Sequence, residues 1–295
     1  MRFTADCGPC LMRRVLFQSR LAGTGREFEA VKASAEVLGS SMDPDVESVR
    51  IATEVHRAAY AAVGCEDPYR ELKIRADAVA GPIAERLEGI VRDSDDPLRA
   101  AVMGAVAGNV LDFGNGTAMD SPDGFEEAYS ELVGQGLAVD DTVLLSELIS
   151  SSPGVVYMFD NCGESCLDLV LMRLIRGMGK RVVAVVRGAP ILNDVAMEDA
   201  LRIRADEVAD RIVDTGGFFI GVDWDDLSEA LSEEIGRCGL IIAKGMANFE
   251  ASSGRGIPVP IVHILRTKCA PVAQALGAPQ NVNVVKVVAP SRNNP

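Results

Sequence analysis

Histidine is nearly absent from the sequence, and its scarcity argues against a common class of hydrolase. The 295 residues include only His56, in a segment with helical spacing, and His263, inside a strand-like run. Neither position suits the base of a Ser/His/Asp triad. No Gly-x-Gly-x-x-Gly follows a strand-like run, and the Walker spacing Gly-x-x-x-x-Gly-Lys-Ser/Thr does not occur. The sequence therefore predicts neither a Rossmann dinucleotide site nor a P-loop.

Long apolar runs and an excess of positive charge are missing too. Hydrophobic residues make up 48%, but charges interrupt every run, and none approaches the roughly 18 to 20 residues that span a bilayer. The first residues, 1–7, lack the apolar region of a signal peptide. The net charge of −14 repels nucleic acid and anionic membranes. Seven irregularly spaced cysteines fit a reducing compartment. We therefore expect a cytoplasmic protein that binds neither nucleic acid nor membrane.

Two kinds of pattern divide the chain. Up to about residue 92 the apolar spacing predicts helices only, the first of them capped by Asp6. The polar, acidic run 92–97 ends in proline and is the expected boundary between a helical N-terminal subdomain, 1–95, and an α/β domain, 96–295. A simple helix–helix loop is an equally good interpretation of that run. Further helices are expected near Phe28–Leu38, Pro44–Val63, Pro68–Val91 and Leu98–Val110.

The second half alternates short β-branched runs with helix-compatible segments. This alternation is typical of a mostly parallel sheet covered by helices, and so of an α/β fold. The expected strands are Val155–Phe159, Arg181–Val186, Arg211–Asp214, Leu240–Ala243, Val259–Leu265 and Val282–Val288.

Polar residues follow the first two of these strands. Asp160 and Asn161 come directly after one, and Asn193 and Asp194 lie beyond the next. Because ligands of an open α/β sheet bind at the carboxyl ends of its strands, Asp160, Asn161 and Asp194 could converge on one crevice. Their oxygens are the ligands that Mg²⁺ or Mn²⁺ prefers. The sequence thus predicts a metal site at this edge.

Other interpretations of these residues stay open. Asp160 and Asn161 could simply form an Asx turn, and Asn193 and Asp194 could cap the helix expected at 196–201. A covalent aspartyl-phosphate enzyme is less favoured, because Cys162 stands where such enzymes carry a second Asp as the acid.

Cations follow two later strands. Lys244 and Gly245 begin a strand-to-helix turn, and Arg266 and Lys268 follow the next strand. Backbone N–H groups at such a turn, together with an ammonium, suit an anion. In an acidic chain this grouping suggests an anionic ligand, although an exposed lysine in an ordinary turn is the alternative.

The motif Cys7-Gly8-Pro9-Cys10 lies at an expected helix N-terminus. That position favours a thiolate, as in thiol–disulfide enzymes. The pair could also be half of a zinc site. Two unligated thiols are the third interpretation.

Taken together and in order, these motifs resemble domain-of-unknown-function family 89, the damage-control phosphatase or acidic-residue-methyltransferase-like family, in its prokaryotic stand-alone branch. The resemblance spans nearly the whole chain. It rests on Cys7-x-x-Cys10, Gly108-Asn109-x-x-Asp112, Phe159-Asp160-Asn161-x-Gly163-Glu164, Pro190-x-x-Asn193-Asp194 and Lys244-Gly245-Met246-x-Asn248-Phe249-Glu250.

The resemblance implies a Rossmann-like three-layer α/β/α core preceded by helices. It also implies a phosphatase of small phosphorylated metabolites that uses Mn, Mg, Co or Ni. Asp160, Asn161 and Asp194 match the metal ligands, and a water attacks the phosphoryl group with Asp112, Glu164 or Asp194 as the candidate base. The implied phosphate- or substrate-binding residues are Asn109, Lys244, Gly245, Met246, Asn248 and Lys268.

One departure from the family pattern concerns Lys268. Eukaryotic relatives carry Arg-Thr-x-Lys, whereas here the lysine comes one place early and Cys269 occupies the matching position. The rival hypothesis is a non-catalytic phosphate- or nucleotide-binding module whose Cys7 and Cys10 respond to redox state or zinc. A methyltransferase is a weaker third hypothesis.

Overall fold

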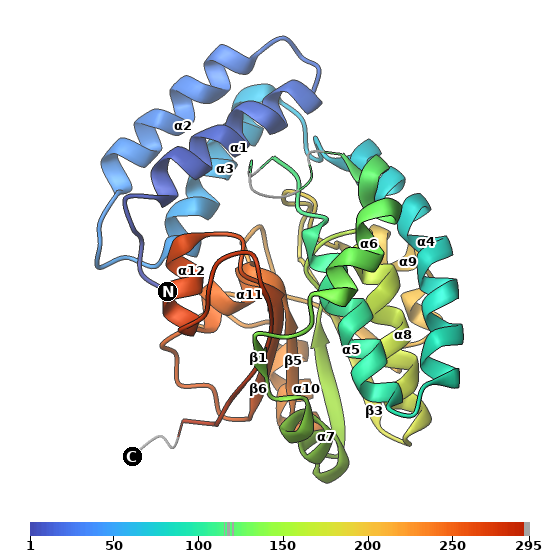
Figure 1. Cartoon of the computed structure of the whole chain (residues 1–295). Coiled ribbons are helices and arrows are strands. Elements are labelled where there is room, and N and C mark those ends of the chain that lie inside the picture. The colour runs from blue at the N-terminus through green and yellow to red at the C-terminus, as the bar shows by residue number, and fades with distance from the viewer. Residues whose placement is uncertain (115, 117–118, 120, 292–295) are drawn as a thin grey trace.

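The computed structural model describes residues 1–114, 116, 119 and 121–291. Its first three helices form a layer with an apolar core of its own, which includes Leu11, Val15 and Val55. Figure 1 shows this layer at one end of the molecule. The three helices are α1 Cys7–Leu21, α2 Glu27–Ser41 and α3 Ser48–Val63.

The fourth helix leaves this layer. Helix α4 (Arg70–Asp93) packs against α5 (Pro97–Ala107) and α8 (Glu164–Gly177), and Figure 1 shows it running beside them. The packing therefore changes between α3 and α4, upstream of the boundary predicted near residue 95, which stays a prediction.

The expected cap at the start of α1 is wrong. The backbone of Asp6 is already helical, with φ −66° and ψ −24°, and its side chain makes no capping hydrogen bond in the described chain. A capping residue normally has extended backbone angles, so that its side chain can fold back onto the first free N–H groups. A backbone bond from Cys7 N–H to Thr4 O, 3.0 Å long, closes a turn there instead.

All six predicted strands form, within two residues of their expected bounds, and in the described part of the chain they belong to a seven-stranded sheet of order β1-β7-β6-β5-β2-β3-β4. Strands β2 to β6 run parallel, whereas β7 runs antiparallel to β6 and pairs parallel with β1. The seventh strand, β1, has two residues and went unpredicted because it is too short to show alternation. The strands are β1 Val139–Asp140, β2 Gly154–Met158, β3 Arg181–Val186, β4 Arg211–Asp214, β5 Ile241–Lys244, β6 Ile261–Arg266 and β7 Asn283–Val288.

Helices cover both faces of the sheet, as alternating residues of β2 show. Val155 and Tyr157 face the core shared with α4, α5 and α8, whereas Val156 and Met158 face the core shared with α10. The predicted three-layer arrangement is therefore confirmed. The remaining helices are η1 Gly108–Val110, η2 Pro122–Gly124, α6 Phe125–Gly134, α7 Thr142–Ser151, α9 Met197–Arg202, η3 Ala205–Glu207, α10 Glu229–Cys238, α11 Gly245–Ser252 and α12 Ala270–Leu276.

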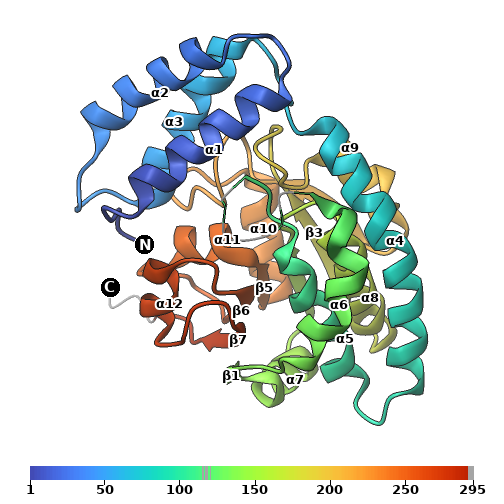
Figure 2. The ribbon, with the colours of Figure 1, turned by 45° about the horizontal axis from the view of Figure 1, so that its top comes forward.

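The strand order places a crevice beside β2. From β2 the chain builds β3 and β4 on one side, and β5 and β6 on the other. Such a reversal point is where α/β sheets bind ligands, at the carboxyl ends of the strands. Figure 2 shows α11 between this part of the sheet and the N-terminal layer, and α11 contacts both α3 and β6. In the described residues, none of the helices is both long and apolar enough to cross a membrane.

Candidate active site

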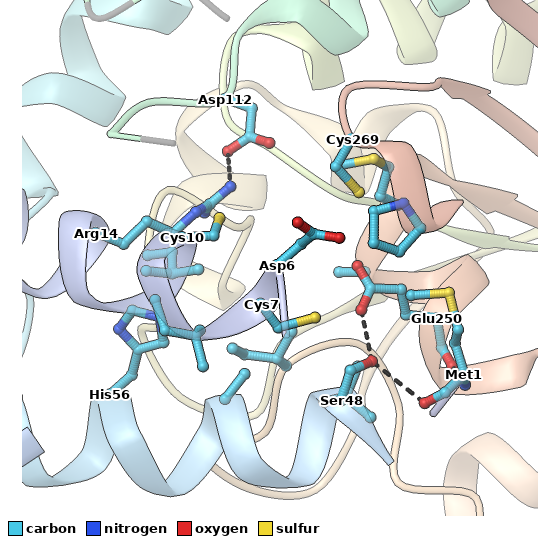
Figure 3. Close-up of a pocket in the computed structure, with 18 of the residues that line it drawn as sticks. Met1, Asp6, Cys7, Cys10, Arg14, Ser48, His56, Asp112, Glu250 and Cys269 are labelled. Carbon is cyan, nitrogen blue, oxygen red and sulfur yellow. Dashed lines mark hydrogen bonds and ion pairs between the residues drawn. The ribbon is translucent and has the colours of Figure 1, made fainter. Parts of the chain in front are cut away.

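A cavity of about 330 Å³ lies between the strand ends and the N-terminal helices. Figure 3 shows its polar lining, with α1 and α3 contributing one wall. The predicted residues that line it are Cys7, Cys10, Asp112, Asp160, Asn161, Asp194 and Met246, together with Arg14, Ala247, Glu250 and Cys269 from outside the prediction.

The segments after β2 and β3 are joined to each other outside the sheet. Asn161 and Asp194 form an isolated antiparallel bridge. Val195 N–H donates to Asp160 O at 2.9 Å, and Cys162 N–H donates to Asn193 O at 2.8 Å. Main-chain bonds therefore bring Asp160, Asn161 and Asp194 together. The helix-capping alternative for Asp194 does not occur, because Ala196 is the N-cap of α9.

Asp160 and Asp194 are each only 4% exposed, and their carboxyl groups have perturbed pKa values. Burial raises the pKa of Asp160 well above its usual range, and the nearby carboxylates of Glu164 and Asp194 raise it further. Burial also raises the pKa of Asp194, against the effect of Arg187. Crowded, buried carboxylates with raised pKa values are typical of functional sites.

Gly245 lets the turn after β5 approach Asp160 closely. Its φ is +71°, and a Cβ built there would lie 1.7 Å from Oδ2 of Asp160. A side chain at residue 245 is thus excluded by both backbone conformation and contact. Gly245 thus leaves space for the Asp160 carboxylate, and its predicted part in phosphate binding stays a prediction.

Three predicted residues belong to a buried network rather than to the pocket lining. Asn109 Nδ2 donates to Glu164 Oε2 at 2.7 Å and to Asp160 Oδ2 at 3.2 Å. Lys244 directs its ammonium into the layer of α5 and α8, where it contacts Ala105 O at 2.9 Å and Asp168 Oδ1 at 2.7 Å. The structure thus gives Asn109 and Glu164 a supporting place around Asp160. It also provides Lys244 with a carboxylate partner inside the protein.

Asp112 and Lys268 form an ion pair at the pocket. Lys268 Nζ lies 2.7 Å from Asp112 Oδ2, and Arg14 Nη2 donates to Asp112 Oδ1 at 2.7 Å. Burial opposes ionisation of Asp112, but Arg14 and Lys268 outweigh it and hold the pKa of Asp112 at about 2. Asp112 is therefore ionised at neutral pH and links α1 to the strand ends.

Asn248 supports the site from the first turns of α11. Its Nδ2 donates to Phe159 O at 3.0 Å and to Lys244 O at 2.8 Å, and its Oδ1 accepts from Arg187 Nη1 at 3.1 Å. These bonds join the ends of three strands. Met246, two positions earlier, lines the cavity and accepts the Lys268 N–H through its sulfur.

Cys7 and Cys10 lie on the first turn of α1 and line the cavity, as does Cys269 (Figure 3). All seven cysteines, each within the described residues, are free thiols. In that same part of the chain, no three His, Cys, Asp or Glu side chains are grouped so as to hold a metal ion. The zinc interpretation of Cys7 and Cys10 stays a prediction.

The predicted metal ligands, two carboxylates and one carboxamide, fit a hard divalent cation. Asp160, Asn161 and Asp194 all reach the cavity, and they offer oxygen donors, which Mg²⁺ and Mn²⁺ prefer. Two buried carboxylates that repel each other also create a negative potential, which favours the binding of a cation.

Sequence reasoning missed two arginines. Arg187, directly after β3, contacts both Asp194 and Asp160, and Arg14 on α1 contacts Asp112. A cation at a strand end was a visible signal for Arg187. Arg14 had no such signal, because its partner lies 98 positions away.

Comparisons with known proteins cover almost the entire chain. The family model of the damage-control phosphatase ARMT1-like domain matches residues 3–284. A damage-control phosphatase from Archaeoglobus fulgidus is 35% identical over 98% of this chain and all of that protein. A damage-control phosphatase from Pyrococcus horikoshii is 30% identical over 76% of each chain.

The fold agrees with these sequence matches. The crystal structure of a DUF89 family protein from Pyrococcus horikoshii superposes with a TM-score of 0.85 at 25% identity, covering 96% of this chain and 98% of that one. The resemblance stated from the motifs is confirmed. The chain belongs to the damage-control phosphatase ARMT1-like domain family, also called DUF89.

Proposed function

We propose that this protein is a divalent-cation-dependent phosphatase of small phosphorylated metabolites. One observation carries the proposal, namely that Asp160, Asn161 and Asp194 converge from two neighbouring strand ends onto a single cavity. Relatives named damage-control phosphatases support the reaction class. The cavity of about 330 Å³ suits a small molecule.

The oxygens of Asp160, Asn161 and Asp194 would hold the cation. When bound, a divalent cation supplies positive charge that offsets the charge developing on a phosphoryl group. Magnesium, manganese, cobalt and nickel are the candidates, because each accepts such oxygen donors.

The proposal extends to other residues of the pocket. Met246 and Ala247 lie in the first turn of α11 and line the cavity, where the positive end of the helix favours a phosphoryl oxygen. Asp112 also lines the cavity and stays ionised at neutral pH, so it can accept a hydrogen bond from an attacking water and orient it. We favour Asp112 over Glu164 as this group, because Glu164 belongs to the buried network.

The test uses metal-stripped protein assayed on p-nitrophenyl phosphate and on a panel of phosphorylated metabolites. Mg²⁺, Mn²⁺, Co²⁺ and Ni²⁺ are added in turn, with Asp160→Ala as the inactive control. We expect turnover that requires a metal and is lost in the variant. The proposal would be rejected if the folded protein showed no turnover with any of these metals.

An absence of turnover in that assay would instead favour the non-catalytic phosphate- or nucleotide-binding module. One observation supports this second candidate function, namely that Cys7 and Cys10 line the same cavity as the strand-end carboxylates. It predicts phosphate binding without turnover, altered when the two thiols are oxidised. Free thiols also fit a reducing cytoplasm, the location that we propose.

A further inference from the structure

Arg187 follows β3 directly, and its backbone holds the loop that carries Asp194. Its N–H donates to Val195 O at 2.8 Å, and it forms an isolated parallel bridge with Ala196. The residue is only 1% exposed. A fully buried guanidinium is costly unless acidic partners compensate its charge.

Both of the carboxylates proposed as cation ligands provide that compensation. Arg187 Nε donates to Asp194 Oδ2 at 2.6 Å, and Nη2 lies 3.6 Å from Asp160 Oδ1. Among the described residues Nη2 has no hydrogen-bond partner, so its interaction with Asp160 is electrostatic. One rigid, planar group therefore faces two carboxylates that reach the site from different strands.

Asn248 also holds the guanidinium in this position. Its Oδ1 accepts from Arg187 Nη1 at 3.1 Å, while its Nδ2 is fixed by Phe159 O and Lys244 O. The arginine is thus tied to the ends of β2, β3 and β5. Contacts within the protein therefore hold its orientation.

We infer that Arg187 is a positioning residue of the cation site. It fixes one oxygen of Asp194, faces one oxygen of Asp160, and so sets the orientation of both carboxylates before a cation arrives. The inference rests on the proposed function, because it takes Asp160 and Asp194 as cation ligands. Partners that orient metal ligands usually change affinity 10- to 100-fold when they are replaced.

Lysine cannot perform this role. Its ammonium is a point charge on a flexible stem, whereas the arginine fork reaches Asp194, Asp160 and Asn248 at fixed angles. Arg187→Lys keeps the positive charge but removes the fixed arrangement of N–H donors. We therefore expect about tenfold weaker cation binding or more in Arg187→Lys, and a smaller loss in Arg187→Gln, because glutamine also removes a positive charge that repels the cation.

The experiment measures Mn²⁺ binding to metal-stripped protein by the loss of the free-ion signal in electron paramagnetic resonance, without any substrate. The matched control is Arg181→Lys, at the first residue of the same strand, where Arg181 pairs with Glu234 at 2.9 Å. This control should bind Mn²⁺ like the wild type. Thermal unfolding checks that each variant is folded.

The outcomes separate the inference from the proposed function. Wild-type protein that binds no Mn²⁺, or Asp160→Ala that binds it normally, would reject the cation site itself. If the cation site is confirmed, an Mn²⁺ affinity of Arg187→Lys within twofold of the wild-type affinity would overturn the inference. Should neither Arg187 variant fold, Asn248→Ala decides. It removes the support of Nη1, so we expect severalfold weaker binding, and unchanged binding would overturn the inference.

Discussion

The two walls of the cavity are built in opposite ways. The strand-end wall, formed by Asp160, Asn161 and Asp194, is buried and joined by main-chain bonds. The helical wall, formed by the first turn of α1, carries an exposed Asp6 and the partly exposed Cys7 and Cys10. One wall is rigid and charged, and the other is partly solvated and contains thiols.

This difference separates two tasks. Groups that stabilise a transition state must be held in place before the reaction, because reorganising them would cost the energy that they supply. Residues that only limit the space around the substrate do not need such rigidity. We interpret the strand-end wall as the chemical part of the site and the helical wall as the part that limits what enters.

The largest expected effect comes from changing the strand-end wall. Asp194→Asn keeps the shape but removes a ligand charge and weakens the contact with Arg187. A loss of about 4 kcal/mol in transition-state stabilisation corresponds to roughly 1000-fold in kcat. Steady-state assays compare it with Asp206→Asn, an exposed carboxyl, which should leave kcat unchanged. Near wild-type turnover in Asp194→Asn would reject the role given to this wall.

A second substitution disturbs the same wall through the backbone. Gly245→Ala places a methyl group against the Asp160 carboxylate and strains a φ of +71°, so we expect about 100-fold lower activity. The control is Gly236→Ala in α10, where no described atom lies within 4 Å of an added Cβ. It should fold more stably by up to ~1 kcal/mol. Equal activities of the two variants would contradict the close approach.

The connection between the walls is expected to depend on pH. Arg14 and Lys268 hold the pKa of Asp112 at about 2, below its ordinary value of 3.8. A lowered carboxyl pKa contributes stability that is complete above about pH 4 and is lost as pH falls towards 2. This contribution is about 2 kcal/mol. Arg14→Met should therefore destabilise the protein most at pH 7 and progressively less below pH 4.

Urea unfolding at pH 7, 5 and 3 measures this difference. Lys286→Met, at the partly buried Lys286 of β7, provides a control substitution whose effect should not follow the titration of Asp112. If the difference in free energy of unfolding between wild type and Arg14→Met stayed constant across this pH range, Arg14 would not be lowering the pKa of Asp112.

The smallest effect should come from the helical wall. Alkylation of Cys7 and Cys10 with iodoacetamide narrows the cavity, and we expect about tenfold lower kcat/KM, or 1.4 kcal/mol. Burial raises the pKa of Cys7, and that of Cys269 to about 12, so modification should be faster at higher pH and slower at Cys269 than at Cys7.

The matched control is the double variant Cys7→Ser, Cys10→Ser. It should keep most of the activity and resist iodoacetamide, and inorganic phosphate should protect the wild type. Full activity after complete modification of both thiols would show that this wall does not bound the substrate.

Much of the fold could be predicted because its signals are local. Each run of β-branched residues from Val155 onward formed a strand, and β1, with two residues, was too short to show a pattern. The convergence of Asp160 and Asp194 follows from topology, because neighbouring parallel strands end at the same edge.

The partners of the charged groups could not be predicted in this way. Lys244 contacts Asp168, 76 positions earlier, and Arg14 contacts Asp112, 98 positions later. Such pairs arise only when helices pack on the sheet, so sequence spacing carries no signal for them. Lys244 therefore looked like a free cation at a strand end, whereas the fold gives it a buried carboxylate.

The bridge between Asn161 and Asp194 has a consequence for protein engineering. The spacing of these two residues is set by main-chain bonds, so the identity of either side chain can change without moving its Cα. Asn161→Asp would add one negative charge to an unchanged frame, and Asn161→His would add a softer nitrogen donor. The site thus offers a fixed scaffold on which ion preference can be redesigned one side chain at a time.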